Sequence, residues 1–343
     1  MKIAILDDYQ NAVPGLDCYK ILDGHEVKVF NTSARGVGQL AIRLAPFDAL
    51  VLIRERTAFS AALLNRLPNL KLIAQTGKVS GHVDVAAATA RGIAIAEGVG
   101  SPVAPAELTW ALIMAASRKI VPYVNNLKEG AWQTASVNPQ LNGLGRVLHG
   151  RTLGLWSYGK IGKLVAGYGK AFGMRVLVWG SEASRAAAVA DGCAAASSRE
   201  ALFAEADVLS LHLRLADATR GIVTAEDLAR MKPDALFVNT SRAELVVEGA
   251  LEEALRRGYP GAAALDVFTS EPLAPDAPLL KIPTVLATPH LGYVEQDSYE
   301  MYFRAAFENI ASFAAGKPTN ILNPAALTTY GGHSVPTRND AHG

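Results

Sequence analysis

Residues 153–163 read LGLWSYGKIGK, and this stretch decides how the rest of the chain is interpreted. An apolar run leads into a group of small residues, and a segment with helical periodicity follows. The pattern approaches the G-x-G-x-x-G turn that binds dinucleotide phosphates between a strand and a helix, but Ser157 stands at its first position. Gly159 and Gly162 hold the other two positions. There, Gly159 would let the backbone approach a pyrophosphate, and Gly162 would let the helix pack on the strand.

The same two glycines also fit a turn without a ligand, since glycine relieves strain in turns of every kind. The preceding strand and the following helix favour the phosphate site, because a helix N-terminus offers unpaired N–H groups to anions. Ser157 could hold a positive φ at a cost of about 1–2 kcal/mol, or it could adopt a slightly different turn. The sequence leaves both conformations open.

Length and composition indicate a globular protein of two domains. The chain has 343 residues, of which half are apolar and 19% are charged, and this composition argues against disorder. The formal net charge is +1, and no block of Lys and Arg suggests a nucleic-acid surface. The longest apolar runs, such as 111–116, are too short to cross a bilayer.

Cys18 and Cys193 are the only cysteines. Two thiols in a chain of this length predict a reducing compartment and no disulfide framework. We therefore expect a cytoplasmic protein. No membrane partner, nucleic-acid partner or metal site is predicted.

Apolar strand-like runs alternate with Ala- and Leu-rich helical patterns, which predicts an α/β fold with parallel sheets. The first strand candidates are 2–6, 26–30, 49–53, 70–75 and 93–97. Six more strand candidates follow at 153–156, 175–179, 207–211, 235–239, 262–266 and 284–288. Helices are expected at 59–67, 83–91, 105–117, 160–171, 183–190, 198–204, 224–230, 248–257 and 295–315.

The two groups of strands predict two doubly wound domains, the second inserted into the first. Residues 1–100 and 291–325 would form a flavodoxin-like substrate domain. Residues 101–290 would form a Rossmann domain, because six strands with intervening helices match a dinucleotide-binding sheet. We expect residues 121–150 to be an irregular arm. The tail 326–343 is polar and rich in Gly and Pro, and we expect it to be disordered.

The end of the second strand of the Rossmann domain bears on the choice of dinucleotide. NAD enzymes usually place an acid there for the ribose 2′-hydroxyl, whereas this chain has Gly180. An acid would repel a 2′-phosphate, so its absence permits NADP, with Ser181 and Arg185 as phosphate ligands. Glu182 could instead reach the ribose hydroxyls and restore NAD. The pattern favours NADP without excluding NAD.

Three polar segments follow later strands of this domain. Arg242 lies in VNTSRAEL, Asp266 and Glu271 lie in ALDVFTSEP, and His290 lies in ATPHLGY. Each residue taken alone fits a structural or solvated role. All of them follow carboxyl ends of strands, the edge at which open α/β sheets bind ligands. Together an arginine, an acid and a histidine form an acid–base set.

These segments resemble the D-isomer-specific 2-hydroxyacid dehydrogenase family, which includes phosphoglycerate dehydrogenases and glyoxylate or hydroxypyruvate reductases. The resemblance covers about residues 45–320. It rests on six motifs in the family's order: TGKVSGHVD (76–84), APAELTWAL (104–112), GRTLGLWSYGKIGKLVAGYGKAFGMRVLVW (150–179), VNTSRAELV (238–246), ALDVFTSEPL (264–273) and ATPHLGY (287–293).

The resemblance implies an NAD(P)-dependent enzyme that interconverts a D-2-hydroxy acid and its 2-oxo acid. Arg242 would bind the carboxylate and carbonyl of the substrate, since a planar guanidinium matches that pair. His290 would donate a proton to the substrate oxygen as hydride arrives. Glu271 would hydrogen-bond to the histidine and raise its pKa. The alternative is a protein of the same fold that senses a dinucleotide without catalysis, and retention of these residues favours the enzyme.

The resemblance also implies roles for other residues and for one region. Backbone amides near Lys78 and Val79 would hold the substrate carboxylate, and Arg54 is a further substrate-binding candidate. Asp266 would orient the nicotinamide amide. The implied cofactor contacts are Thr109, Ser157, Tyr158, Gly159, Lys160, Ile161, Gly162, Gly180, Ser181, Glu182, Arg185, His212, Arg214, Thr219, Thr240, Ser241, Asp266 and Gly292. The helix and arm at 105–150 would pair two copies into a homodimer.

Several positions depart from the family pattern. The family usually has glycine at Ser157, an acid at Gly180 and proline at Arg214. A glycine usually follows the catalytic arginine, where this chain has Ala243 and Glu244. The substrate-loop triplet N-I-D is replaced by His82-Val83-Asp84. The departures leave the catalytic groups intact, and they bear on the cofactor and on the shape of the substrate pocket.

Overall fold

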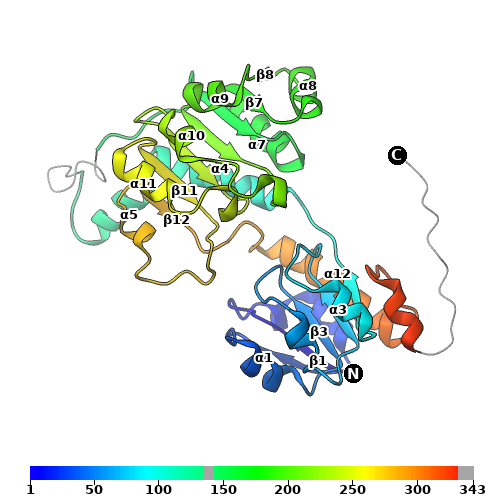
Figure 1. Cartoon of the computed structure of the whole chain (residues 1–343). Coiled ribbons are helices and arrows are strands. Elements are labelled where there is room, and N and C mark those ends of the chain that lie inside the picture. The colour runs from blue at the N-terminus through cyan, green and yellow to red at the C-terminus, as the bar shows by residue number, and fades with distance from the viewer. Residues whose placement is uncertain (134–142, 331–343) are drawn as a thin grey trace. The chain divides into compact units, whose positions relative to one another are not determined.

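The structure is a computed structural model that describes residues 1–133 and 143–330. The chain divides into two compact units (Figure 1). Unit 1 consists of Met1–Ser101 together with the chain from Glu295 onwards, and unit 2 is Pro102–Val294. Within the described residues, no helix is long and apolar enough to span a membrane.

The sheet of unit 1 has five parallel strands in the order β2-β1-β3-β4-β5. This is the flavodoxin-like order, so the predicted fold class of this unit is confirmed. All residues of β3 and β4 are buried, as expected for a sheet covered on both faces. The strands are β1 (Lys2–Ile5), β2 (Glu26–Val29), β3 (Ala49–Leu52), β4 (Leu72–Gln75) and β5 (Ala94–Glu97).

Two helices near the end of the described residues complete unit 1. The 19-residue helix α12 (Gln296–Ala314) buries Phe303 and Phe307 in this unit. The 3₁₀ helix η6 (Pro324–Tyr330) follows, and Ala326 within it is fully buried. The expectation of a disordered tail from residue 326 is therefore wrong for 326–330, and its remainder lies outside the described residues. The other helices are η1 (Val13–Gly15), η2 (Asp17–Leu22), α1 (Val37–Leu44), α2 (Ala61–Leu64) and α3 (Val85–Ala90).

Unit 2 contains a seven-stranded parallel sheet in the order β12-β11-β10-β9-β6-β7-β8. Strands β7 and β8 lie on one side of β6, and strands β9 to β12 lie on the other side. The order of strand addition therefore reverses between β6 and β9, which is the Rossmann switch point, and the predicted fold class is confirmed. The sequence predicts six of these strands and misses the two-residue β8. The strands are β6 (Thr152–Trp156), β7 (Arg175–Trp179), β8 (Ala194–Ala195), β9 (Val208–Leu211), β10 (Leu236–Asn239), β11 (Ala262–Leu265) and β12 (Val285–Ala287).

One helix of unit 2 falls in the region expected to be irregular. Helix α5 (Ile120–Lys128) occupies the start of the predicted arm, so that part of the prediction is wrong. Pro122 lies in its first turn, where the missing N–H costs no helical hydrogen bond. The remaining helices are α4 (Val103–Ser117), α7 (Lys160–Ala171), α8 (Glu182–Ala190), α9 (Arg199–Glu205), η3 (Asp217–Thr219), α10 (Ala225–Ala229), η4 (Ala243–Leu245), α11 (Ala250–Arg257) and η5 (Pro278–Lys281).

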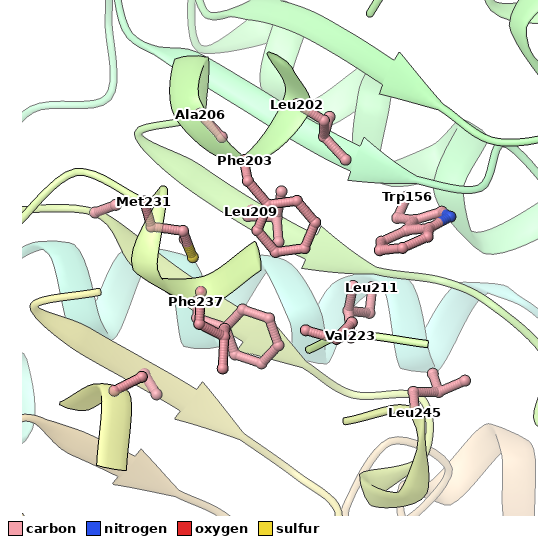
Figure 2. Packing of buried hydrophobic residues seen from close by; sticks show 14 of the residues in the cluster. Trp156, Leu202, Phe203, Ala206, Leu209, Leu211, Val223, Met231, Phe237 and Leu245 are labelled. Atoms are coloured by element: carbon pink, nitrogen blue, oxygen red, sulfur yellow. The ribbon is translucent and has the colours of Figure 1, made fainter. Parts of the chain in front are cut away.

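A buried aromatic cluster anchors the strand that precedes the phosphate turn. Trp156, the last residue of β6, packs edge-on against Phe203 of α9, with ring centroids 5.7 Å apart (Figure 2). Gly154 in the same strand lets α9 approach closely, since a Cβ there would lie 2.9 Å from Cβ of Ala206. This packing fixes the end of β6, from which the glycine-containing turn departs.

Candidate active site

The turn after β6 has the geometry of a phosphate-binding turn. Ser157 adopts φ +87°, which settles the conformation that the sequence left open. Its N–H donates to the carbonyl of Trp179 at 2.8 Å. A Cβ on Gly162 would lie 2.6 Å from the Ser157 carbonyl oxygen, so the turn requires glycine there. At Gly159, the N-cap of α7, a Cβ would meet no atom of the described chain within 4 Å.

This open side of the turn fits a pyrophosphate, because the first N–H groups of α7 lack helical acceptors and attract anions. Lys160, the first residue of α7, is exposed, and Ile161 is half-buried. Tyr158 differs from its neighbours, because its side chain is 6% exposed and its hydroxyl donates to Asp191 at 3.1 Å. Its burial raises the pKa of the phenol. Tyr158 could therefore meet a cofactor only through its backbone.

The end of β7 carries the residues expected to select the dinucleotide. Gly180 adopts φ +156°, and a Cβ there would contact Cβ of Ser184 at 3.3 Å. Ser181 caps α8, with its hydroxyl accepting from the Ser184 N–H at 3.2 Å. The guanidinium of Arg185 lies 4.7 Å from the ring centroid of Trp179, which restrains it by a cation–π contact. Glu182 is exposed in the first turn of α8.

His212, Arg214 and Thr219 follow β9. The His212 ring hydrogen-bonds through Nε2 to the Ser210 hydroxyl at 3.0 Å, and burial lowers its pKa to about 4. Arg214 is exposed. The Thr219 hydroxyl donates to the Arg214 carbonyl at 2.7 Å and accepts from the Ala216 N–H at 2.8 Å. In the structure Thr219 thus closes the loop that carries Arg214.

Three adjacent strands bring the acid–base residues to one edge of the sheet. Strands β10, β11 and β12 are neighbours, and Asn239, Leu265 and Ala287 at their ends are in register. Arg242 lies three positions beyond the first of these residues, and His290 three beyond the last. Segments from separate parts of the sequence therefore leave the same carboxyl edge, as the motifs predict.

His290 and Glu271 form a close pair. Nδ1 of His290 lies 2.7 Å from Oε2 of Glu271, and the other carboxylate oxygen accepts the Phe268 N–H at 2.9 Å. His290 has φ +54°, and its ring packs edge-on against Tyr293 at 5.4 Å. The carboxylate fixes the orientation of the imidazole through Nδ1 and directs proton exchange to Nε2.

The loop after β10 is held by hydrogen bonds within itself and to neighbouring segments. The Asn239 side chain donates to the Arg242 carbonyl at 2.8 Å and accepts the Ser241 N–H at 3.0 Å. The Ser241 hydroxyl donates to the Leu213 carbonyl. Thr240 shares a 2.7 Å hydrogen bond with buried Thr109 of α4. The backbone that presents Arg242 is therefore rigid on both sides.

Asp266 is fully buried directly after β11. It accepts hydrogen bonds from the Thr288 hydroxyl and the Leu291 N–H, both at 2.7 Å, and from the Gly292 N–H at 2.9 Å. Burial raises its pKa in spite of these donors. The family resemblance implies that Asp266 orients the nicotinamide. The structure shows a contact that the sequence did not reveal, since Asp266 holds the turn that carries His290.

In unit 1, Arg54 follows β3 with φ +52°. Its N–H donates to the Thr76 hydroxyl at 3.0 Å, and its carbonyl accepts from Gln75 at 3.0 Å. Oε1 of the same Gln75 side chain lies 3.1 Å from Nε2 of His82. The guanidinium lies against Gly77, where any Cβ would collide with it. These bonds tie Arg54 to the predicted substrate loop.

The substrate loop also contains an acid that the sequence analysis missed. The Val79 N–H, expected to be available for a substrate carboxylate, donates to Oε1 of Glu97 at 2.9 Å. The Lys78 ammonium pairs with Oε2 of the same side chain at 2.9 Å. In this structure the Val79 amide is therefore engaged by Glu97. No signal in the sequence links these residues, because β4 and β5 bring them together.

The phosphate turn at a Rossmann switch point and the histidine–glutamate pair define a dinucleotide-binding oxidoreductase. A profile described as "D-isomer specific 2-hydroxyacid dehydrogenase, NAD binding domain" matches residues 110–292. The chain therefore belongs to the D-isomer specific 2-hydroxyacid dehydrogenase family, as its motifs suggest. Its cofactor is a nicotinamide dinucleotide.

Relatives support this assignment along most of the chain. A glyoxylate reductase of Aeropyrum pernix is 40% identical over 265 residues, covering 76% of this chain and 78% of that protein. A solved structure from Ralstonia solanacearum is 58% identical with a TM-score of 0.93 and covers 95% and 98% of the two chains. A phosphoglycerate oxidoreductase of Vibrio cholerae is also 58% identical, with a TM-score of 0.89 and coverage of 92% and 99%.

Proposed function

We propose that this protein interconverts a D-2-hydroxy acid and its 2-oxo acid, with His290, Glu271 and Arg242 as the catalytic residues. The observation that carries the proposal is the 2.7 Å contact between His290 and Glu271 at the ligand edge of the sheet. The rigid loop of Arg242 leaves the same edge. A bound nicotinamide dinucleotide would supply or accept the hydride.

His290 acts as the proton donor in the reductive direction. Its Nδ1 is engaged by Glu271, so Nε2 is the nitrogen that gives a proton to the substrate oxygen. Glu271 orients the ring and stabilises its positive charge while the proton is held. In the oxidative direction the same nitrogen takes the hydroxyl proton.

Arg242 binds the acidic substrate through its carboxylate and carbonyl groups. A guanidinium offers two parallel N–H donors, which suit the adjacent carboxylate and carbonyl oxygens of a 2-oxo acid. Arg54 and the loop at Lys78 and Val79 are proposed as further substrate contacts from unit 1. Their positive charge and N–H donors suit an anionic substrate.

The turn of residues 157–162 holds the pyrophosphate, with Gly159 supplying the open approach. Thr109, Thr240, Ser241, Asp266 and Gly292 are proposed to line the nicotinamide side. His212, Arg214 and Thr219 are proposed to border the adenosine.

The function is tested by measuring NADH and NADPH oxidation with glyoxylate, hydroxypyruvate, pyruvate, phenylpyruvate, oxaloacetate and 2-ketogluconate. His290→Gln should lower kcat by at least a factor of 10² while cofactor affinity stays unchanged, because general acid catalysis contributes about 10²–10⁴. Glu271→Gln should lower kcat less and change its pH profile. A wild-type protein that binds the dinucleotide but reduces no 2-oxo acid would contradict the proposal and support a sensor.

We also propose that NADP(H) is the preferred dinucleotide. Gly180 stands where NAD enzymes usually carry an acid, while Ser181 and the restrained Arg185 offer donors for a 2′-phosphate. Arg185→Ala should raise KM for NADPH about tenfold and leave KM for NADH nearly unchanged, since one charge-assisted contact to phosphate is lost. Glu182→Gln is the matched control. Equal effects on both cofactors would argue for NAD.

A cytoplasmic homodimer is the proposed state of the protein. Both cysteines are free and buried, which suits a reducing compartment. Apolar side chains of α5 are exposed by 41–58%, which suits an interface between copies.

A further inference from the structure

Glu97 is the last residue of β5, at the carboxyl end of an edge strand of unit 1. Its backbone is fixed on both sides. The N–H donates to the Asn320 carbonyl at 2.9 Å, and the carbonyl accepts from the Asn309 amide at 3.1 Å. Its side chain is only 16% exposed, although it carries a carboxylate. The main chain therefore holds this acid in one place.

The partners of this carboxylate are a backbone amide and an ammonium. Oε1 accepts the Val79 N–H and Oε2 accepts from Lys78, both at 2.9 Å. An amide with a nearby cation is a donor set that recognises a free carboxylate. Both donors belong to the loop that the proposed function gives to the substrate as a further contact. Glu97 thus binds the loop as a substrate acid would.

We propose that Glu97 is an internal competitor for substrate, a specificity-determining residue that occupies the carboxylate donors of the substrate loop until an acid displaces it. This inference rests on the proposed function. Lys78 is 72% exposed, and an ion pair with so exposed a partner is weak. Displacement therefore needs only a substrate carboxylate whose binding is supported by a second contact. A ligand without such a second contact does not displace Glu97.

The charge of Glu97 is the quantity to change. Glu97→Gln keeps an oxygen for the Val79 N–H but loses the attraction to Lys78 and the charge assistance of the hydrogen bond. In the full chain with saturating NADPH or NADH, we expect the Kd of oxamate, the amide isostere of a 2-oxo acid, to fall three- to tenfold. KM for the reduced 2-oxo acid should fall by a similar factor, and the effect on kcat should be smaller.

Glu26→Gln is the matched control. Glu26 pairs with Lys2 at 3.6 Å on β2, the opposite edge strand of the same sheet. The variant removes one negative charge from the same unit, so it shows how far the loss of any such charge tightens the binding of anionic oxamate. Lys78→Met should weaken oxamate binding, because it removes a donor and not the competitor. Glu97→Asp keeps the charge but shortens the side chain, so it should also tighten binding, and it serves if Glu97→Gln does not fold.

An unchanged or higher Kd of oxamate in both Glu97 variants would overturn the inference, as would an equal fall in the Glu26→Gln control. These outcomes leave the proposed function intact, provided that the wild type reduces a 2-oxo acid. A wild type that neither reduces such an acid nor binds oxamate overturns the proposed function and this inference with it.

Discussion

Ser157 carries a side chain at φ +87°, a backbone conformation that suits glycine. The conformation persists because the turn is fixed from outside, by the bond to the Trp179 carbonyl and by the close approach of Gly162. A strained residue at a ligand-binding turn is a common feature of functional sites. Here the strain falls at the position where the sequence departs from the glycine pattern.

Ser157→Gly should therefore stabilise the protein. Glycine removes the cost of the left-handed conformation, about 1–2 kcal/mol, but adds freedom to the unfolded chain, about 0.5–1 kcal/mol. We expect a net gain of about 0.5–1 kcal/mol in the free energy of unfolding, measured by urea denaturation. Ser157→Ala retains a Cβ and should show no gain. A loss of stability in the glycine variant would mean that the serine hydroxyl contributes more than the strain costs.

His212 predicts a pH dependence of stability. Burial lowers its folded-state pKa to about 4, against 6.5 for the unfolded chain. Between these values the unfolded state binds the proton more readily, so stability falls as the pH falls from 7 towards 4. The loss between pH 7 and pH 5 should be about 2 kcal/mol. The free energy of unfolding of His212→Gln should therefore fall by about 2 kcal/mol less than that of the wild type between pH 7 and pH 5, as measured by urea denaturation at both pH values. Equal falls in the two proteins would contradict the assignment of this pH dependence to His212.

Residue types and spacing predicted that Arg242, Glu271 and His290 follow strands whose carboxyl ends share one edge of the sheet. The contact between His290 and Glu271 was implied by the family resemblance, and the structure has it at 2.7 Å. Glu97 could not be found in this way. A single acid at a strand end has many ordinary roles, and its bond to Val79 exists only through the pairing of β4 with β5.

At the scale of elements, buried strands were predicted best. Their apolar runs are continuous because both faces of each parallel sheet are covered. Strand β8 has only two residues and leaves no such run. Helix α5 was missed because Pro122 and two asparagines are typical of loops. Tertiary position outweighed this local preference.

Helix α3 offers a test of local structure in the substrate loop. Asp84 is the last residue of the triplet His82-Val83-Asp84, which replaces N-I-D in this chain. It is the N-cap of α3, and its carboxylate accepts the Ala87 N–H at 2.9 Å. Asp84→Ala should lower the free energy of unfolding by about 1 kcal/mol. Asp84→Asn retains an acceptor and should lower it much less. Thermal or urea denaturation distinguishes the two, and equal losses would show that charge matters more than the cap.

At the scale of the whole molecule, the exposed apolar face of α5 predicts a dimer. Leu127 on this helix is 58% exposed, beside Val124 at 43%. Light scattering at micromolar concentration should give twice the chain mass, and Leu127→Glu should reduce it towards one chain, because a buried unpaired charge is costly. Ile42→Glu places the same change on the 82% exposed Ile42 of α1 and should leave the mass unchanged. A wild type of single-chain mass would contradict the proposal.

The division of the chain also sets the order in which its parts can be completed during synthesis. Unit 1 needs α12 and η6, since Phe303, Phe307 and Ala326 are buried in it and Asn323 bonds to the backbone of Ile93 and Ile95. Those residues leave the ribosome after the whole of unit 2. Unit 2 is one continuous segment and is available as a whole before them. The Rossmann unit can therefore be completed before unit 1, because Met1–Ser101 must wait for α12 and η6, the reverse of the usual N-terminal-first order.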